Sequence, residues 1–280
     1  MAAIKQRVGL GIDIGGTGLK AALVDLDKGE LVTRRIRHDT PKPATPDAVG
    51  DEIRAVVSEL EAEHSFPEVL PIGAGLPSVV KEGIVLTAAN IDKGWIGVDA
   101  AKLFQEKLGR PVMPLNDADA AAIAEERFGA GRDFSGTVLL LTIGTGIGSG
   151  LLIDGRLVPN TEFGHVEFKG RDAERQLSGV ARERRRLRWK AWALEFSDYL
   201  ARLELYVSPD LIILGGGVSK VFAKYREWLT TRAPIVPAQF LNTAGIIGAA
   251  LAAGDAARHG KVVDAPLTLR RKPARQTAAS

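Results

Sequence analysis

The chain of 280 residues contains no cysteine, which excludes disulfide bonds, thiolate zinc sites and cysteine nucleophiles. Long hydrophobic runs are also absent, because no apolar stretch approaches the roughly 20 residues that span a bilayer. Residues 1–7 do not have the layout of a signal peptide and are expected to lead directly into a strand. These absences favour a cytoplasmic protein that has no membrane partner.

The composition is otherwise that of a globular protein. Hydrophobic residues make up 45% of the chain and charged residues 25%, so there is enough apolar material for a substantial core. A chain of this length forms one large domain or two domains of ordinary size.

The net charge of +3 is unevenly distributed. Residues 171–190 hold eight basic and three acidic side chains, and residues 267–280 hold four basic and no acidic ones. Basic patches attract polyanions, but no zinc-finger or RNP-type motif accompanies them, so we expect no nucleic-acid partner. A solvated helix face explains the first patch, and a disordered tail over 264–280 explains the second.

A glycine-rich turn separates two apolar runs near the N-terminus. The first run, residues 8–14, carries one acid, Asp13, and the second covers residues 21–24. Glycine lets backbone N–H groups approach an anion, and a carboxylate beside such a turn can hold a hydrated metal ion. The alternative is a tight β-hairpin with an aspartate at a buried edge. The turn itself is Gly15-Gly16-Thr17-Gly18.

The same pattern returns in residues 137–153. Residues 137–143 form an apolar strand, Gly144-Thr145-Gly146 begins the turn, and residues 149–153 form the next strand. Such self-similarity predicts two related halves, which we place at 1–118 and 119–280. Because both turns lead into strands, they are poor candidates for dinucleotide binding. Two turns that face each other across a cleft could instead hold a phosphate chain from both sides.

Hydrophobic periodicity and turn signals predict an α/β protein. A β-meander is expected over residues 21–36, with further strands over 72–77, 111–115, 156–158 and 210–214. Helices are expected over 46–60, 99–108, 117–128, 189–206 and 244–257, and another from Ser219. The aromatic stripe that ends at Tyr206 is expected to be buried. The last helix is rich in small residues, so we expect it to pack closely, back against the N-terminal domain.

Asn116 and Asp117 lie where a predicted strand meets a predicted helix. Asn and Asp are favoured at helix N-caps, so a purely structural role is one interpretation. In a phosphate-binding protein, however, a carboxylate at this junction could act as a general base. It would accept the proton of a substrate hydroxyl as that oxygen attacks phosphorus.

Glu162 and His165 interrupt an otherwise apolar segment, and Gly164 allows a tight fold between them. Acidic and imidazole groups at this spacing can hydrogen-bond to adjacent hydroxyls of a sugar. A metal site is the alternative, but the chain has only four histidines and no cysteine. The other histidines, at positions 38, 64 and 259, are expected at the surface.

These stretches resemble the ROK family of sugar kinases, within the actin, hexokinase and Hsp70 superfamily, and are most similar to the polyphosphate glucokinases of actinobacteria. The resemblance covers residues 8–256. It rests on both glycine turns, on Asn90-Ile-Asp-Lys-Gly-Trp95, on Asn116-Asp117, on Glu162-x-x-His165 and on Gly215-Gly216-Gly217. It implies an α/β protein with the actin-like, ribonuclease H-like ATPase fold, in which two similar domains flank a cleft.

One departure from the family pattern is informative. Most members carry a cysteine-rich zinc loop after the Gly-His element, whereas only eight residues separate His165 from Glu174 here. From the Ser-Gly that follows, Glu174 occupies the place of the family's sugar-binding glutamate. The resemblance therefore implies that the zinc site is absent and that the sugar ligand is kept.

The resemblance also assigns roles by residue. Asp117 would be the catalytic base, and Asp13 would hold Mg²⁺ through water. Lys20 could add a positive charge to the phosphate site, but we expect it to be a solvent-facing lysine at a strand edge. The sugar site would comprise Asn90, Asn116, Asp117, Glu162, His165, Glu174, Gly75 and Pro77. The donor phosphates would contact Asp13, Gly15, Gly16, Thr17, Gly18, Thr142, Gly144, Thr145, Gly146, Gly215 and Gly216.

The implied reaction is phosphoryl transfer from inorganic polyphosphate to the 6-hydroxyl of glucose, and whether ATP is also a donor stays open. The alternative is a strictly ATP-dependent kinase for mannose, fructose or another hexose. A non-catalytic sugar-binding regulator is a further alternative, but only seven residues precede the first predicted strand, so we expect no DNA-binding domain ahead of it. Mannose as a second substrate, a homodimer, and polyphosphate binding by the basic cluster Arg182–Lys190 remain open.

Overall fold

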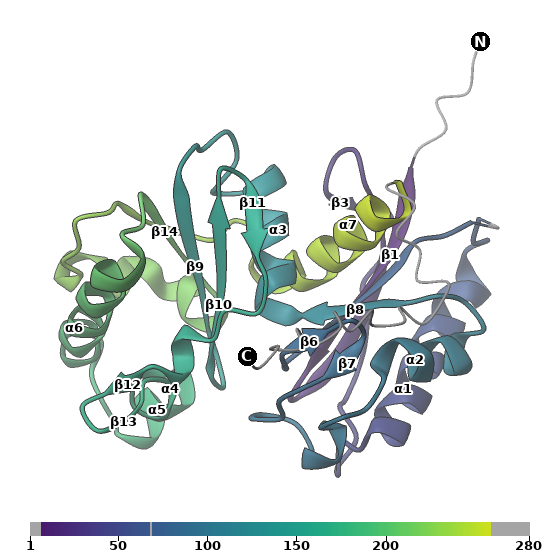
Figure 1. Ribbon diagram of the computed structural model, residues 1–280, viewed down its shortest axis with the longest axis horizontal. Coiled ribbons are helices and arrows are strands. Elements are labelled where there is room, and N and C mark those ends of the chain that lie inside the picture. Colours follow the sequence, from purple (N-terminus) through teal and green to yellow (C-terminus); the bar gives the residue numbers. More distant parts are fainter. Residues whose placement is uncertain (1–6, 68, 259–280) are drawn as a thin grey trace, which may run out of the picture.

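The computed structural model describes residues 7–67 and 69–258. Within them, two large β-sheets stand apart and helices cover both faces of each sheet (Figure 1). The predicted disordered tail over 264–280 and His259 lie outside the described residues.

The N-terminal sheet has the strand order β3-β2-β1-β5-β8, and β4 also pairs with β2. β1 and β2 form an antiparallel hairpin, and β5 and β8 continue the sheet in parallel. The predicted meander is only partly right, because β3 and β4 are short and both lie against β2. The strands are β1 (Val8–Gly15), β2 (Gly18–Asp25), β3 (Glu30–Leu31), β4 (Ile36–His38), β5 (Ile72–Leu76) and β8 (Met113–Asn116).

The C-terminal sheet has the order β11-β10-β9-β14-β15. Here too a long antiparallel hairpin, β9 with β10, is extended by two parallel strands. The two sheets therefore share one topology, which explains the repeated strand–turn–strand pattern. The strands are β9 (Thr137–Ile143), β10 (Ile147–Ile153), β11 (Arg156–Val158), β14 (Leu211–Gly215) and β15 (Ile235–Pro237).

Helices α1 (Pro46–Glu63) and α2 (Ala100–Leu108) pack on the outer side of the N-terminal sheet and share its core. Helix α6 (Trp189–Val207) does the same for the C-terminal sheet, and its side chains Trp192, Phe196 and Tyr199 are buried there. Helices α3 (Asp117–Phe128) and α7 (Ala244–Arg258) lie side by side between the two sheets (Figure 1). A third core cluster therefore joins the two halves of the molecule.

Local signals set several helix ends. Thr45 caps α1 and Asp99 caps α2, because each side chain accepts a hydrogen bond from a backbone N–H in the first turn. Gly109, at φ 66°, ends α2 in the left-handed conformation that glycine adopts readily. The helices predicted over 99–108 and 189–206 are confirmed to within one residue at each end.

Three expectations were wrong. The segment from Ser219 is not an α-helix but part of a kinked 3₁₀ segment, η3 (Gly217–Lys224). Tyr206 is 58% exposed, because α6 turns this side chain away from the core. His38 is not a simple surface residue, since its ring lies between the carboxylates of Glu52 and Glu59.

Helix α7 packs unusually close to its neighbours. A Cβ atom on Gly11 of β1 or on Gly73 of β5 would collide with the carbonyl groups of Ile246 and Ala249, respectively. A Cβ atom on Gly248 would collide with the carbonyl of Ala120 in α3. Glycine at these crossings lets the backbones approach, which holds α7 against both the N-terminal sheet and α3.

The remaining elements are short and form the rims of the two halves. Among the described residues, no helix is long and apolar enough to cross a bilayer. These elements are β6 (Val80–Lys81), β7 (Ile84–Val85), η1 (Lys93–Trp95), η2 (Phe163–His165), β12 (Glu167–Phe168), β13 (Arg171–Asp172), α4 (Glu174–Leu177), α5 (Gly179–Arg184), η4 (Arg226–Trp228) and η5 (Leu241–Thr243).

Candidate active site

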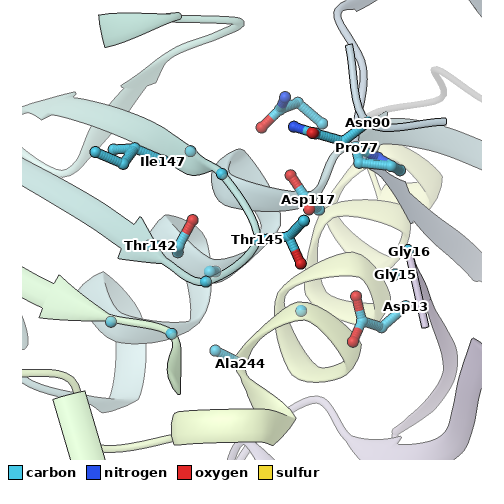
Figure 2. Close-up of a pocket in the computed structure, with 18 of the residues that line it drawn as sticks. Asp13, Gly15, Gly16, Pro77, Asn90, Asp117, Thr142, Thr145, Ile147 and Ala244 are labelled. Atoms are coloured by element: carbon cyan, nitrogen blue, oxygen red, sulfur yellow. The ribbon is translucent and has the colours of Figure 1, made fainter. Parts of the chain in front are cut away.

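A cavity of about 400 Å³ lies between the two sheets and receives both glycine turns. Asp117 points into it, with Asn90 and Pro77 on one side and Thr145 on another, while Asp13 and Thr142 lie across the cavity from each other (Figure 2). The residues predicted to bind phosphate and those predicted to bind sugar thus meet in one space. The predicted residues that line it are Asp13, Gly15, Gly16, Thr17, Pro77, Asn90, Asn116, Asp117, Thr142, Gly144, Thr145, Gly146, Glu162, His165, Glu174, Gly215 and Gly216.

Asp13 and Lys20 form an ion pair at one end of this cavity. Asp13 Oδ2 lies 2.6 Å from Lys20 Nζ, because the two residues face each other across the β1–β2 hairpin. Lys20 lines the cavity and its side chain is 22% exposed, so the expectation of a solvent-facing lysine was wrong. The strand pairing of the β1–β2 hairpin places Lys20 opposite Asp13 and so directs its side chain into the cavity, and this pairing could not be seen in the composition.

Two predicted residues, Gly18 and Gly75, do not line the cavity. Gly18 is buried under the guanidinium of Arg37, and a Cβ atom there would lie 2.9 Å from Arg37 Nε. Gly75 is buried in β5, where its added Cβ would lie 3.4 Å from the Cα of Asp117. Both glycines therefore make room for a neighbouring side chain or backbone and do not offer a direct contact to a ligand.

The second turn is built on the same plan. Thr142 of β9 lies opposite Gly148 of β10 and Gly215 of β14, as Asp13 of β1 lies opposite Lys20 and Gly75. Where the N-terminal sheet carries a lysine, the C-terminal sheet thus carries a glycine. Gly216, at φ 75°, packs onto the backbone of Ile143, where any side chain would clash.

Asp117 is the first residue of α3 and sits at the end of β8. Its burial raises the pKa of its carboxyl from 3.8 to about 7, and the negative charges of Asp13 and Glu162 act in the same direction. A hydrogen bond from the backbone N–H of Ala118 acts in the opposite direction. The carboxyl therefore titrates near neutral pH, which is where a general base works best.

Asn116 combines the two roles that the sequence left open. Its Oδ1 accepts hydrogen bonds from the backbone N–H groups of Ala118 and Asp119, at 2.8 and 3.0 Å, so it caps α3. Its Nδ2 donates to Glu162 Oε1 at 3.4 Å, inside the cavity. The cap thereby fixes the amide that reaches toward the predicted sugar site.

Asp119 is a buried acid that the sequence analysis did not single out. It is 2% exposed, and its Oδ2 accepts a hydrogen bond of 2.7 Å from the backbone N–H of Asn160. Burial raises the pKa of Asp119 to about 7. The Asn160 side chain in turn bonds to the backbone N–H and C=O of Val80. This chain of contacts ties α3 to loops from both halves of the molecule.

The predicted sugar-binding side chains contact one another around the second turn. His165 lies 3.7 Å from Glu162 through Nε2 and 3.3 Å from Asp172 through Nδ1. Glu174 Oε2 accepts a hydrogen bond of 3.3 Å from the backbone N–H of Ile147. Burial raises the pKa of Glu162, and the charge of Glu174 adds to the effect.

Asn90 reaches this group from the N-terminal half. A Cβ atom on Gly146 would lie 2.8 Å from Asn90 Nδ2 and would also clash with Glu174. The absence of a side chain at Gly146 therefore leaves room for both Asn90 and Glu174 beside the second turn.

The cavity wall also includes residues that sequence reasoning missed. Gly245, in the first turn of α7, comes so close to Asp13 that an added Cβ would lie 3.0 Å from Asp13 Oδ1. No local motif marks this contact, because it depends on the return of the last helix to the first strand. Lys20 and Gly217 also line the cavity, and the lining residues that the sequence analysis did not name for the site are Thr87, Ala89, Ala121, Glu125, Leu140, Ile147, Gly148, Ala238, Leu241, Asn242, Ala244 and Gly245.

The basic cluster Arg182–Lys190 does not line the cavity, and several of its arginines have partners elsewhere. Arg182 donates to the carbonyl of Leu187 and lies 4.0 Å from the ring centre of Trp189. Arg184 donates to the carbonyl of Arg175. Arg185 pairs with Glu195 through both terminal nitrogens, at 2.8 and 2.9 Å.

Asp13 is the carboxylate beside the first glycine turn, where the sequence predicts Mg²⁺. Over residues 7–67 and 69–258, no group of three His, Asp or Glu side chains is arranged to hold a metal ion. Mg²⁺ does not need such a group, because it keeps several waters and is commonly bound by one or two carboxylates together with substrate phosphates.

The fold and the cavity define the class of protein. Two sheets of one topology, each bringing a glycine-rich turn to a shared cavity, form the actin-like ATPase fold of the sugar kinases. The chain belongs to the ROK family, whose model matches residues 9–183.

Three relatives illustrate the similarity. The polyphosphate glucokinase of Mycobacterium tuberculosis strain H37Rv is 47% identical over 251 residues, which are 89% of this chain and 92% of that protein. The crystal structure of an inorganic polyphosphate/ATP-glucomannokinase from Arthrobacter sp. strain KM is 48% identical, with a TM-score of 0.86, and the match covers 89% of this chain and 98% of that one. A ROK family glucokinase from Streptomyces griseus, in complex with glucose and AMPPNP, is 27% identical, with a TM-score of 0.74 and coverage of 89% and 99%.

Proposed function

We propose that this protein transfers a phosphoryl group from inorganic polyphosphate, or from ATP, to the 6-hydroxyl of glucose. The observation that carries the proposal is the position of Asp117, in one cavity with both glycine turns and with the polar group around Glu162. The similarity to polyphosphate glucokinases over most of the chain supports the choice of substrates.

Asp117 is the base in this reaction. Its carboxylate accepts the proton of the 6-hydroxyl as that oxygen attacks the terminal phosphorus of the donor. A pKa of about 7 keeps much of the group ionised at neutral pH, yet basic enough to take the proton. Closure of the two domains over the sugar would exclude water, which would otherwise compete with the sugar as the nucleophile.

The other hydroxyls of glucose are held by Asn90, Asn116, Glu162, His165 and Glu174, and Pro77 lines the same pocket. Asn116 donates through Nδ2, whereas Glu162 and Glu174 accept through carboxylate oxygens. Since these groups come from both halves of the molecule, a bound sugar bridges the two sheets. Such bridging holds the 6-hydroxyl in reach of Asp117.

The donor phosphates lie between the two glycine turns. Backbone N–H groups of Gly15, Gly16 and Gly146 and the hydroxyls of Thr17 and Thr145 can all donate hydrogen bonds to phosphate oxygens. Lys20 adds a positive charge next to Asp13. Asp13 would hold Mg²⁺ through water, and the ion would neutralise charge on the transferring phosphate.

The proposal is tested by measuring glucose 6-phosphate formation with ATP and with long-chain polyphosphate in parallel. We expect both donors to be used and the activity to be lost on addition of EDTA and regained with Mg²⁺. If glucose 6-phosphate formed with neither ATP nor polyphosphate, the proposal would be refuted. Turnover with ATP alone would restrict it to an ATP-dependent hexose kinase.

Mannose is proposed as a second acceptor, because the Arthrobacter relative of 48% identity is a glucomannokinase. The same assay with mannose tests this extension.

We also propose that the protein forms a homodimer. The exposed apolar residues Leu205 and Tyr206 on α6 support this proposal, and sedimentation equilibrium tests it.

A further inference from the structure

A row of charged side chains crosses the N-terminal sheet at one end of the cavity. Asp13 on β1 lies opposite Lys20 on β2, and Lys20 in turn lies opposite Arg37 on β4. Residues directly opposite on neighbouring strands project from the same face of a sheet. Since Asp13 and Lys20 line the cavity, Arg37 continues the row from the cavity outward.

Arg37 is fixed to the first glycine turn. Its Nη2 donates a hydrogen bond of 3.0 Å to the carbonyl of Thr17, and the missing side chain of Gly18 leaves room for its guanidinium. Its Nη1 pairs with Asp39 at 2.9 Å, but the Asp39 side chain is 84% exposed. An ion pair that exposed is weak, so an anionic ligand can compete for the guanidinium, which is itself 47% exposed.

Arg35 brings a second arginine to the same rim. Its Nη1 lies 3.4 Å from the carbonyl oxygen of Asn242, a residue that lines the cavity. Asn242 belongs to η5, which packs beside η3, the element that begins at Gly217. Arg35 therefore stands at the part of the cavity rim that η5 forms.

We propose that Lys20, Arg37 and Arg35 bind the phosphate units of a polyphosphate chain that extend beyond the two glycine turns. This inference rests on the proposed function and assigns the donor-binding surface within it. Polyphosphate carries a charge on every unit, so it gains from each cation along such a row. The charges of ATP end at its third phosphate, so ATP reaches fewer of these cations.

This row is a better candidate for the polyphosphate-binding surface than the basic cluster Arg182–Lys190. None of the arginines Arg182, Arg184 and Arg185 in that cluster lines the cavity. The row, in contrast, begins inside the cavity and is continuous with the first turn.

The test compares the double variant Arg35→Gln/Arg37→Gln with the wild type on three donors: long-chain polyphosphate, tripolyphosphate and ATP. We expect the KM for long-chain polyphosphate to rise about tenfold, since two exposed charge contacts are removed. The KM values for tripolyphosphate and ATP should change much less. The dependence of the polyphosphate KM on salt should also become shallower, because fewer charge contacts remain to be screened.

The matched control is Arg184→Gln/Arg186→Gln, which removes the same charge from the basic cluster and should leave all three KM values unchanged. A rise in the polyphosphate KM that occurred only in this control variant would overturn the inference. An equal rise in KM for all three donors in Arg35→Gln/Arg37→Gln would also overturn it, because it would mean that Arg37 only positions the first turn. Replacing Arg37 by lysine, in place of glutamine, should restore most of the affinity for long-chain polyphosphate, because the positive charge is kept. If the wild type used ATP but no polyphosphate, the proposed donor itself would be refuted, and the inference with it.

Discussion

At the scale of single residues, Asp117 and Asp119 show how one helix end can hold two acids in different roles. Both follow the Asn116 cap, and burial raises the pKa of each to about 7. Asp117 faces the cavity, whereas Asp119 is turned away from it and bonds to the backbone of Asn160. We therefore expect the first acid to govern turnover and the second to govern stability.

Replacing Asp117 by asparagine should lower kcat by several orders of magnitude, because only the proton-accepting group is removed. Glucose binding should persist, since the amide has nearly the same shape and can still hydrogen-bond to the sugar. Steady-state kinetics and calorimetric titration with glucose check the two parts separately. Turnover near that of the wild type would remove Asp117 from its assigned role.

The pH dependence of kcat/KM should follow the raised pKa of Asp117. Below about pH 7 the carboxyl of the free enzyme becomes protonated and cannot accept a proton, so kcat/KM should fall about tenfold per pH unit. Above about pH 7 the profile should level off. Initial rates at low glucose between about pH 5 and 8.5 measure it, and a profile that levels off already at pH 5 would contradict the prediction.

Asp119 should affect stability with a definite sign. The folded protein retains this proton up to about pH 7, whereas an ordinary aspartate loses it near pH 3.8, so the free energy of unfolding contributed by Asp119 falls as the pH rises between these values. Asp119→Asn removes this loss, and its oxygen can still accept the hydrogen bond from Asn160. The free energy of unfolding of the variant should therefore increase relative to that of the wild type as the pH rises, by on the order of 2 kcal/mol at pH 8.

Urea unfolding of both proteins at several pH values measures this difference. A difference that stays constant from about pH 4.5 to 8 would show that Asp119 is ionised in the folded protein. Turnover with glucose should change little, because Asp119 does not line the cavity.

At the scale of secondary-structure elements, what could be predicted depended on how local its signal is. Both glycine turns, the Asn116 cap and helix α6 follow from short patterns of neighbouring residues, and the structure contains them all. Lys20 was misplaced because its direction depends on the β1–β2 register. Arg37 was missed because its strand, β4, follows β2 only after β3 and a further loop, so its pairing with Lys20 leaves no local signal.

The contacts of α7 were beyond local reasoning for a related reason. The small residues of this segment predicted close packing, but the positions it contacts, such as Gly11 and Gly73, are far away in the chain. Glycine at a strand centre is compatible with a bulge, a ligand or a helix, and only the fold shows which.

The α3–α7 crossing offers a direct test at this scale. Gly248→Ala would place a methyl group against the carbonyl of Ala120, so α7 must shift, and we expect a loss of about 2–3 kcal/mol in the free energy of unfolding. The matched control is Gly50→Ala in α1, whose nearest neighbour is the flexible side chain of Lys107 at 3.1 Å. That change should be neutral or should stabilise by about 0.5–1 kcal/mol through helix propensity.

Urea unfolding of the two variants compares them under the same conditions. Equal stability of both would mean that α7 has more freedom at this crossing than the contacts of Gly248 indicate. Gly248→Ala should also lower the activity, because a shift of α7 moves Gly245 relative to Asp13.

At the scale of the whole molecule, we propose that the two sheets belong to two domains, residues 1–118 and 119–280, with α7 packed back on the first. The shared topology of the sheets and the position of the cavity between them support this division. The side chains assigned to glucose come from both domains: Asn90 and Asn116 from the first, Glu162 and Glu174 from the second. A sugar that contacts both sides gains most when the cavity narrows, so glucose should stabilise a more closed arrangement.

Small-angle X-ray scattering in solution measures that closure. Saturating glucose should lower the radius of gyration, because the two domains approach each other around the sugar. A polyol that does not bind, at the same concentration, is the control for solvent contrast, and Asp117→Asn should close as the wild type does, because it keeps the groups that bridge the domains. Unchanged scattering at a glucose concentration that calorimetry shows to be saturating would mean that the cavity is already formed without sugar. Exclusion of water would then rest on the sugar and the walls of the cavity alone.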